Sequence, residues 1–265
     1  MSRFDGVILD VDGTVLRGDE ALPGAPAAVT ALREAGCSVC FFSNNPTISP
    51  EALAARLTRA GVETAPAEVL TSGSVTAEFL AADRPDDRLF VVGEDGFCEQ
   101  LRTRGLELTG DHAAADTVVA SIDRAFTYDD LKRSLWALTD DAVGFVGTDP
   151  DRIIPTAEGD APGSGAIVNA VADVAGRRPE AILGKPHEGA RDAALAVLDV
   201  PPERCLVVGD RLDTDIAMAE WTAMESALTL SGVTTTRDLA SDVRDPHAGL
   251  PDHVVDSLDE VVDLL

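Results

Sequence analysis

Short apolar segments alternate with amphipathic segments along this chain of 265 residues. The apolar segments are rich in Val, Ile, Leu and Phe, which is typical of strands buried on both faces. In the segments between them, apolar residues recur every three or four positions, which predicts amphipathic helices. Because strands that alternate with helices form parallel sheets, the pattern predicts an α/β fold with a doubly wound parallel sheet.

The alternation begins near the N-terminus and restarts in the middle of the chain. One open sheet containing every predicted strand would be unusually large, so we expect two domains, the second inserted in the first. We place the first domain at 1–79 and 180–265 and the inserted one at 80–179. The predicted strands are 7–13, 38–45, 69–73, 88–96, 116–122, 142–149, 180–186, 204–211, 225–232 and 253–258, with a hairpin at 16–24. The predicted helices are 25–35, 51–61, 74–82, 96–105, 127–140, 165–176, 191–199 and 213–221.

Two acidic residues end the first predicted strand. Asp10 and Asp12 lie two positions apart, so their carboxylates point to the same side. Ligands of parallel α/β sheets bind beyond the carboxyl ends of the strands. Two close carboxylates repel each other unless a cation or a shared proton compensates them, and Mg²⁺ prefers oxygen ligands. Because Asp-Gly is also a common turn dipeptide, a simple turn is the alternative for this segment taken alone.

Polar groups of a complementary kind end further strands. Ser43 and Asn44 end the second strand, and their hydroxyl and amide groups suit phosphate oxygens. Lys185 is a point charge suited to a phosphate or a carboxylate, and Asp210 ends another apolar strand, with Asp215 shortly after it. If these residues only capped surface turns, the apolar strands would not need to bring all of them to one edge of the sheet. The pattern therefore predicts that these residues share one functional site.

The residues named above lie in four segments that resemble the motifs of a known family. Four segments are similar, in this order, to the four motifs of the haloacid dehalogenase-like phosphatases: DVDGT (10–14), FFSNN (41–45), GKP (184–186) and GDRLDTD (209–215). The middle region resembles that of subfamily IIA, the NagD-like and p-nitrophenylphosphatase-like enzymes. The resemblance implies a Rossmann-like catalytic core at 1–79 and 180–265 and an inserted α/β cap domain of the C2 type at 80–179.

The resemblance implies a role for each acidic residue. Asp10 would attack phosphorus and form an aspartyl-phosphate, while Asp12 would protonate the leaving oxygen and later activate water. Mg²⁺ would be held by the Asp10 carboxylate, the Asp12 main-chain carbonyl and Asp210. Asp215 would support the metal as a direct ligand or through a neighbouring ligand.

The remaining motif residues would bind substrate. Ser43, the backbone of Asn44 and the side chain of Lys185 would hold the phosphoryl oxygens. A cap that closes over the leaving group favours a small phosphomonoester: a sugar phosphate, a nucleoside monophosphate or a phosphoglycolate-like acid. Two alternatives stay open, namely a catalytically silent ligand-sensing or assembly protein on the same fold, and phosphoryl transfer to a sugar acceptor.

Two places depart from the family pattern. Asp149 stands where Asn usually precedes Pro-Asp, which adds a negative charge where the leaving group is expected. Ala219, Trp221 and Ala223 stand in a turn that usually contains Gly and Asn. Without those glycines, we expect a reshaped loop or a longer helix.

The charge balance narrows the set of partners. Asp and Glu total 47 against 21 Lys and Arg, which gives a net charge of −26. Such a field repels nucleic acid and anionic membranes, so we expect neither as a partner.

Lys132 and Lys185 are the only lysines, and an acidic surface so poor in Lys predicts a halophilic protein, with an ordinary acidic protein as the alternative. We expect a cytoplasmic location, since the chain has no apolar run of about 18 residues and no signal pattern. A homo-oligomer formed through the cap remains an option.

Overall fold

The computed structural model describes residues 2–156, 158–220, 222–239 and 248–265. The chain divides into two compact units. Unit 1 comprises 1–43, 50–70 and 190–265, and unit 2 comprises 44–49 and 71–189. The expected bounds of the inserted domain, 80 and 179, both lie inside unit 2, and its role as a cap stays a prediction.

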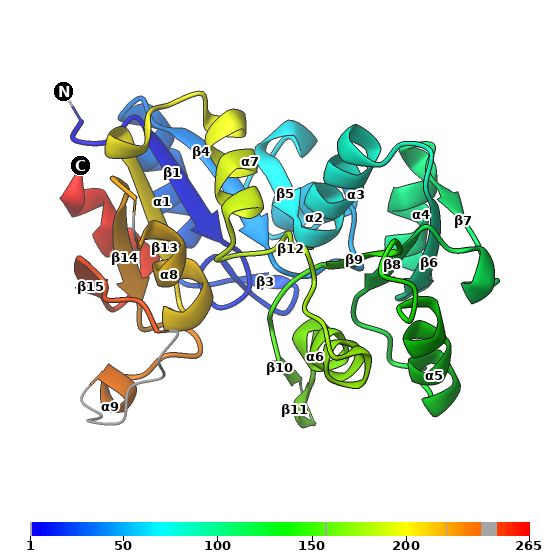
Figure 1. Cartoon of the computed structure of the whole chain (residues 1–265). Coiled ribbons are helices and arrows are strands. Elements are labelled where there is room, and N and C mark those ends of the chain that lie inside the picture. Colours follow the sequence, from blue (N-terminus) through cyan, green and yellow to red (C-terminus); the bar gives the residue numbers. More distant parts are fainter. Residues whose placement is uncertain (1, 157, 221, 240–247) are drawn as a thin grey trace. The chain divides into compact units, whose positions relative to one another are not determined.

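The sheet of unit 1 has the strand order β15-β14-β13-β1-β4-β5 (Figure 1). Its pairs β1–β4, β1–β13, β13–β14 and β14–β15 are parallel. In the central strand, Val7, Ile8 and Leu9 are fully buried, as expected for a strand that is covered on both faces. The strands are β1 (Gly6–Asp10), β4 (Ser38–Ser43), β5 (Val69–Thr71), β13 (Cys205–Gly209), β14 (Glu225–Thr229) and β15 (His253–Val255).

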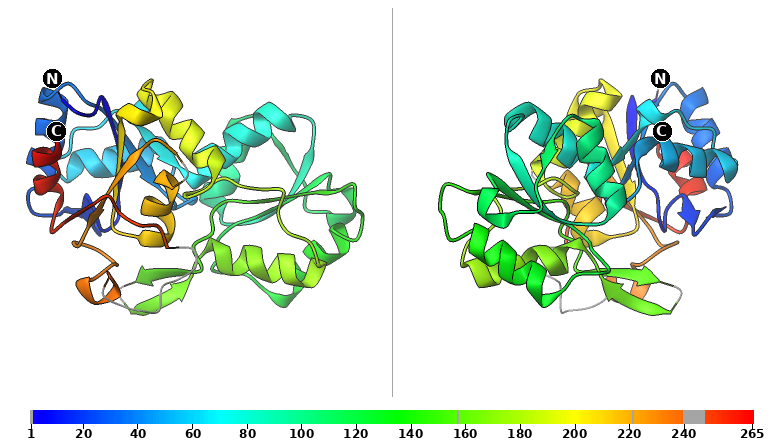
Figure 2. Two further views of the ribbon diagram at one scale, coloured as in Figure 1. Left: turned by 60° about the vertical axis from the view of Figure 1, so that its left-hand side comes forward. Right: turned by 90° about the vertical axis from the view of Figure 1, so that its right-hand side faces the viewer.

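Helices cover both faces of this sheet. Helix α1 and the helical turn η5 contact each other on one face, and α7 lies on the opposite face (Figures 1 and 2). Connections between parallel strands are right-handed as a rule, so a chain that leaves β1 toward both edges of the sheet places helices on both faces. The helices are α1 (Ala25–Glu34), α2 (Pro50–Arg59), α7 (Glu188–Leu198), α8 (Ala217–Ala219) and α9 (Thr236–Leu239). The 3₁₀-helical and π-helical turns are η1 (Pro66–Glu68), η3 (Pro202–Arg204), η4 (Leu212–Ile216) and η5 (Leu258–Leu264).

Helix α1 shows how the sequence sets an element of unit 1. Gly24 precedes it with a φ of 83°, and Gly36 follows it with a φ of 91°, conformations that glycine adopts at little cost. Between them, Ala28, Val29 and Leu32 form the buried stripe. The loop before α1 contains the predicted hairpin, as the antiparallel strands β2 (Leu16–Arg17) and β3 (Glu20–Ala21).

Unit 2 has a sheet of its own, in the order β12-β9-β8-β6-β7. Helices α5 and α6 pack together on one face of this sheet, and α3 and α4 lie on the other (Figure 1). Phe145, Val118 and Val171 are fully buried in its apolar core. The strands are β6 (Arg88–Val92), β7 (Glu107–Leu108), β8 (Thr117–Ala120), β9 (Gly144–Gly147) and β12 (Ala181–Ile182), with the hairpin β10 (Ile153–Thr156) and β11 (Gly159–Pro162). The helices are α3 (Ser72–Asp83), α4 (Asp95–Thr103), α5 (Tyr128–Ala137), α6 (Ser164–Ala175) and the turn η2 (His112–Ala114).

The predicted fold class, α/β with a parallel sheet core, is confirmed. The strand predicted at 69–73 ends early, because Thr71 caps α3: its Oγ1 accepts a hydrogen bond from the Ser74 N–H, and Ser74 Oγ accepts one from the Thr71 N–H, both at 3.0 Å. The helix predicted at 213–221 is wrong in kind, since residues 212–216 form the wider π-helical turn η4 and α8 is short. Trp221 lies outside the described residues.

Among the described helices, none is both long and apolar enough to span a membrane.

Candidate active site

Asp10 and Asp210, two of the predicted acidic positions, lie at the centre of the sheet of unit 1. Strand β1 ends at Asp10, and its neighbour β13 ends at Gly209, directly before Asp210. The register pairs Leu9 with Val208, so the two strands end side by side. The chain runs from β1 to β4 on one side and reaches β13 on the other. Strand β1 is therefore at the point where the strand order reverses, the usual ligand site of such sheets.

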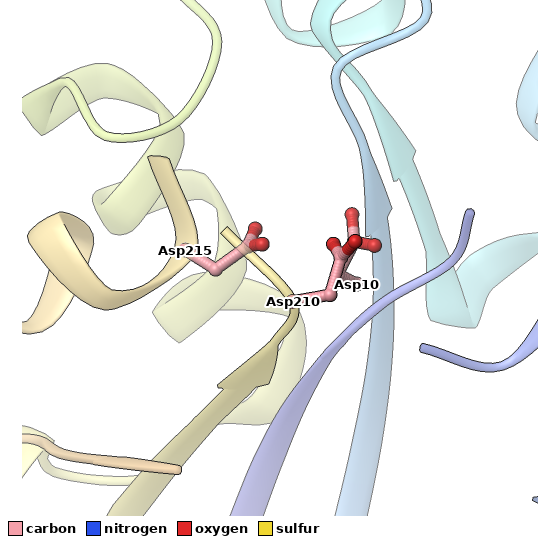
Figure 3. A group of neighbouring side chains, drawn as sticks. All are labelled: Asp10, Asp210 and Asp215. Atoms are coloured by element: carbon pink, nitrogen blue, oxygen red, sulfur yellow. The ribbon is translucent and has the colours of Figure 1, made fainter. Parts of the chain in front are cut away.

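Three carboxylates meet at this edge (Figure 3). One oxygen from each of Asp10, Asp210 and Asp215 lies within 4.8 Å of the others. Asp210 and Asp215 are 0% and 1% exposed, and Asp10 is half-buried. Carboxylates so close and so buried repel one another unless a cation or a shared proton compensates them. An all-oxygen set of hard donors fits Mg²⁺.

The backbone around Asp210 leaves room for its carboxylate and little else. The Val233 N–H donates a hydrogen bond to Asp210 Oδ2 at 2.5 Å. A Cβ at Gly232 or at Gly13 would overlap this same carboxylate oxygen. Gly13 also has a φ of 103°, which side chains rarely adopt. The two glycines and the N–H therefore form a cradle that fixes Asp210 toward Asp10.

Asp215 is fixed in a similar way by its own loop. The π-helical turn η4 brings its side chain back toward the end of β13, where a Cβ at Gly209 would overlap its carboxyl group. The Arg211 N–H donates to Asp215 Oδ2 at 3.1 Å. Asp213 is in the same turn but faces elsewhere: its carboxylate pairs with the Arg211 guanidinium at 3.0 Å. The geometry thus separates Asp215, which joins the cluster, from Asp213.

The side chain of Asp12 lies apart from the cluster of three carboxylates. It is 50% exposed, and its Oδ1 accepts a hydrogen bond from Arg56 Nη2 at 2.7 Å. Arg56 comes from α2 and also donates to the Gly18 carbonyl. The turn after β1 is tight, because the Leu16 N–H bonds the Val11 carbonyl at 2.8 Å. Sequence reasoning missed Arg56, since no motif links a helix residue to a carboxylate 44 positions earlier.

The predicted phosphate-binding residues fall in both units. Ser43 is the last residue of β4, one position after the register partner of Asp10, and is 4% exposed. Asn44 and Lys185 belong to unit 2, where the Asn44 side chain holds the Lys185 backbone at two points. Asn44 Oδ1 accepts from the Lys185 N–H at 2.8 Å, and Asn44 Nδ2 donates to the Lys185 carbonyl at 3.0 Å. The sequence suggested a use for the Asn44 backbone but not for this side-chain clamp.

Known proteins match this chain over nearly its whole length. The haloacid dehalogenase-like hydrolase family model matches residues 7–107, and a HAD-hydrolase-like model matches residues 182–261. The sugar-phosphatase AraL of Bacillus subtilis is 32% identical over 259 residues, which cover 98% of this chain and 92% of that protein. The chain belongs to the haloacid dehalogenase-like hydrolases. A 5'-nucleotidase of Bacillus subtilis, YutF, is 30% identical over 260 residues and covers 98% of both chains.

Solved structures identify the subfamily to which this haloacid dehalogenase-like hydrolase belongs. The p-nitrophenyl phosphatase from Archaeoglobus fulgidus superimposes with a TM-score of 0.92 and 34% identity over 99% of both chains. This hydrolase therefore belongs with the NagD-like and p-nitrophenylphosphatase-like enzymes of subfamily IIA, as its motifs indicated. It is a phosphoric monoester hydrolase by family.

Proposed function

We propose that this protein is a Mg²⁺-dependent phosphatase that hydrolyses a small phosphomonoester through an aspartyl-phosphate on Asp10. The observation that carries the proposal is the cluster of Asp10, Asp210 and Asp215 at the reversal point of the sheet. A cation stabilises a buried concentration of negative charge, and a cation beside a strand-end carboxylate favours attack on a phosphate ester. The kinship with phosphatases agrees with this chemistry.

In the first step, a carboxylate oxygen of Asp10 attacks phosphorus. A bond forms between this oxygen and phosphorus, the ester P–O bond breaks, and the leaving oxygen takes a proton from Asp12. In the second step, water attacks phosphorus while Asp12 takes its proton, so Asp10 is regenerated and phosphate is released. Asp12 is paired with Arg56 in the structure. Proton transfer therefore requires this exposed ion pair to open, at a modest cost.

The acidic cluster would hold the metal. The Asp10, Asp210 and Asp215 carboxylates and the Asp12 main-chain carbonyl are its proposed ligands. When bound, Mg²⁺ would offset the negative charge that builds up between the phosphate and these carboxylates. The cradle of Gly13 and Gly232 would keep Asp210 in place for this role.

The proposed substrate is a sugar phosphate, a nucleoside monophosphate or a phosphoglycolate-like acid. Relatives named as a sugar phosphatase and a 5'-nucleotidase support the first two classes. Ser43, Asn44 and Lys185 are proposed to bind the phosphoryl oxygens, and the domain at 80–179 is proposed to act as the cap that selects the leaving group.

A panel of phosphomonoesters tests this function. p-Nitrophenyl phosphate and members of the three substrate classes are assayed with Mg²⁺ at low and high KCl, and scored by kcat/KM. We expect turnover of p-nitrophenyl phosphate and a preference for one class. Turnover of none would favour the catalytically silent alternative. A phosphorylated acceptor in place of free phosphate would show phosphoryl transfer to a sugar instead.

We also propose that the acidic surface adapts this protein to a salt-rich cytoplasm. With a net charge of −26, repulsion between surface carboxylates opposes the folded state, and salt screens it. We expect the melting temperature to rise steadily with KCl up to molar concentrations. Differential scanning calorimetry measures this rise. A flat or falling trend would show that the acidic surface does not depend on salt.

A further inference from the structure

A carboxyl group of unit 2, that of Asp149, is buried among hydroxyl groups. It lies two residues after β9 and is 1% exposed. The sequence predicts that Asp149 adds a negative charge beside the leaving group, and the structure seals this side chain from solvent. Its Oδ2 lies 3.0 Å from Thr148 Oγ1 and 3.3 Å from Ser72 Oγ. Its Oδ1 accepts the Asp151 N–H at 3.3 Å.

The hydrogens available to these groups determine the direction of each bond. Ser72 Oγ carries one hydrogen, and it lies 2.7 Å from the Asn44 carbonyl, which can only accept. With that hydrogen used, the contact between Ser72 Oγ and Asp149 Oδ2 needs a hydrogen from Asp149. Thr148 Oγ1 can donate to Asp149 Oδ2, because Ser121 Oγ, 3.0 Å away, can donate to Thr148 in turn. Every bond of the network is then satisfied only if Asp149 Oδ2 is an O–H.

The network leads from Asp149 to the backbone of Lys185. Asp149 Oδ2 contacts Ser72, whose hydroxyl bonds the Asn44 carbonyl. The Asn44 side chain then closes its two hydrogen bonds on the Lys185 backbone. On the other side, Gly184 lies so close that a Cβ there would overlap Asp149 Cβ. Asp149 therefore contacts the Lys185 loop directly and holds it indirectly through Ser72 and Asn44.

We propose that Asp149 is a protonated carboxylic acid at neutral pH and a positioning residue, whose O–H fixes Ser72 and, through Asn44, the backbone of Lys185. The catalytic part of this inference rests on the proposed function, in which Lys185 binds the phosphoryl group. The protonation of Asp149 rests only on the contacts in unit 2.

The surroundings favour the neutral form. Burial is the main cause that raises the pKa of Asp149 to about 8, and the negative charge of Asp151 adds to it. Hydrogen bonds from Ser164 and Thr148 act in the opposite direction but do not offset burial. The elements packed around the group present Ser72 from α3, Ser164 from α6 and Ser121 after β8, all uncharged. Asp151, Arg152 and Lys185 are charged residues on its flanking loops.

Ionisation would change the network in a definite way. A carboxylate has no hydrogen to donate, so Ser72 would have to divide its one hydrogen between Asp149 and the Asn44 carbonyl. A buried charge beside Asp151 would also be costly. Both effects loosen Asn44 and, with it, the clamp on Lys185. We therefore expect kcat/KM to fall as the pH rises through about 8, because the folded-state pKa is about 8.

Asp149→Asn is the first variant of the test, since its amide N–H₂ donates at every pH to both Ser72 and Thr148. We expect Asp149→Asn to keep kcat/KM for p-nitrophenyl phosphate within about threefold of wild type at pH 7. It should also lose the alkaline decline near pH 8. Asp141→Asn, which makes the same charge change at an exposed residue of unit 2, is the matched control and should keep the wild-type profile. Ser72→Ala breaks the link to Asn44 and should lower kcat/KM at least about fivefold, mainly through KM.

Two measurements test the proton without any turnover. Infrared difference spectroscopy should show the carbonyl band of a protonated carboxyl at pH 7 in wild type and Asp141→Asn, and lose it in Asp149→Asn. The pKa of Asp149 is about 8 when folded and near 3.8 when unfolded, so the folded state keeps a proton that the unfolded state has lost. The melting temperature of wild type should therefore fall relative to Asp149→Asn as the pH rises from 5 to 8.

The outcomes separate the two proposals. If the protein shows no turnover but does show the infrared band and the melting shift, the proposed function and the positioning role are overturned. The protonation of Asp149 is then still supported. Absence of the band, together with superimposable pH profiles of wild type and Asp149→Asn, would overturn the inference while leaving the phosphatase intact.

Discussion

Asp10→Asn is expected to lower kcat for p-nitrophenyl phosphate at least about a hundredfold. An amide oxygen is a far weaker nucleophile than a carboxylate, so the aspartyl-phosphate could not form. The substitution keeps the size of the side chain and removes one of three crowded negative charges. We therefore expect the variant to keep the fold, and its melting temperature without metal to be equal to or higher than that of wild type. Steady-state kinetics and circular dichroism melting measure the two effects.

The matched control for Asp10→Asn is Asp263→Asn, the same change at an exposed residue of unit 1. It should leave kcat within about twofold of wild type. Trapping supports the assignment further, because wild type mixed with labelled substrate and quenched in acid should carry label on Asp10. Turnover by Asp10→Asn above about a hundredth of wild type would remove Asp10 from the role of nucleophile.

Asp210→Asn is expected to disrupt metal binding. The Asn oxygen can still accept the Val233 N–H, so the cradle is kept while the charge that attracts the cation is reduced. We expect kcat/KM to fall at least about a hundredfold at fixed Mg²⁺, and the half-saturating Mg²⁺ concentration to rise at least about tenfold. Added Mg²⁺ should raise the melting temperature of wild type but hardly that of the variant.

Asp213→Asn is the control for this prediction, because Asp213 is in the same turn but pairs with Arg211 outside the cluster. Its Mg²⁺ titration should match that of wild type. Chelation by EDTA should stop turnover by wild type, and Mg²⁺ in excess should restore it. Full activity in EDTA, or equal Mg²⁺ titrations of wild type and Asp210→Asn, would contradict a metal site at Asp10, Asp210 and Asp215.

The sequence predicted the fold class and the convergence of three distant residues for a clear physical reason. Strands buried on both faces are continuous apolar runs, and the carboxyl ends of parallel strands meet at one edge. Asp10 and Asp210 each end such a run, so their meeting follows from the sheet alone. Asp215 was harder to place, because its position depends on a π-helical turn where the pattern predicted an α-helix.

Contacts made by side chains between elements could not be predicted in the same way. The ion pair of Arg56 with Asp12 depends on how α2 lies beside the loop after β1. The spacing of apolar residues in the sequence does not reveal this placement. The clamp of Asn44 on Lys185 joins loops 141 residues apart. Asp149 carries a formal charge in the sequence, and only its burial among hydroxyl groups shows that the neutral form is favoured.

The central place of β1 in its sheet has a consequence for the synthesis of the chain. Strand β1 (Gly6–Asp10) leaves the ribosome long before its partner β13 (Cys205–Gly209) is synthesised. At bacterial or eukaryotic translation rates, the interval is roughly 10–40 s, during which one hydrogen-bonding edge of an apolar strand has no native neighbour. Such an edge can pair with other nascent chains. Repulsion between chains with a net charge of −26 opposes this association until β13 is available to pair with β1.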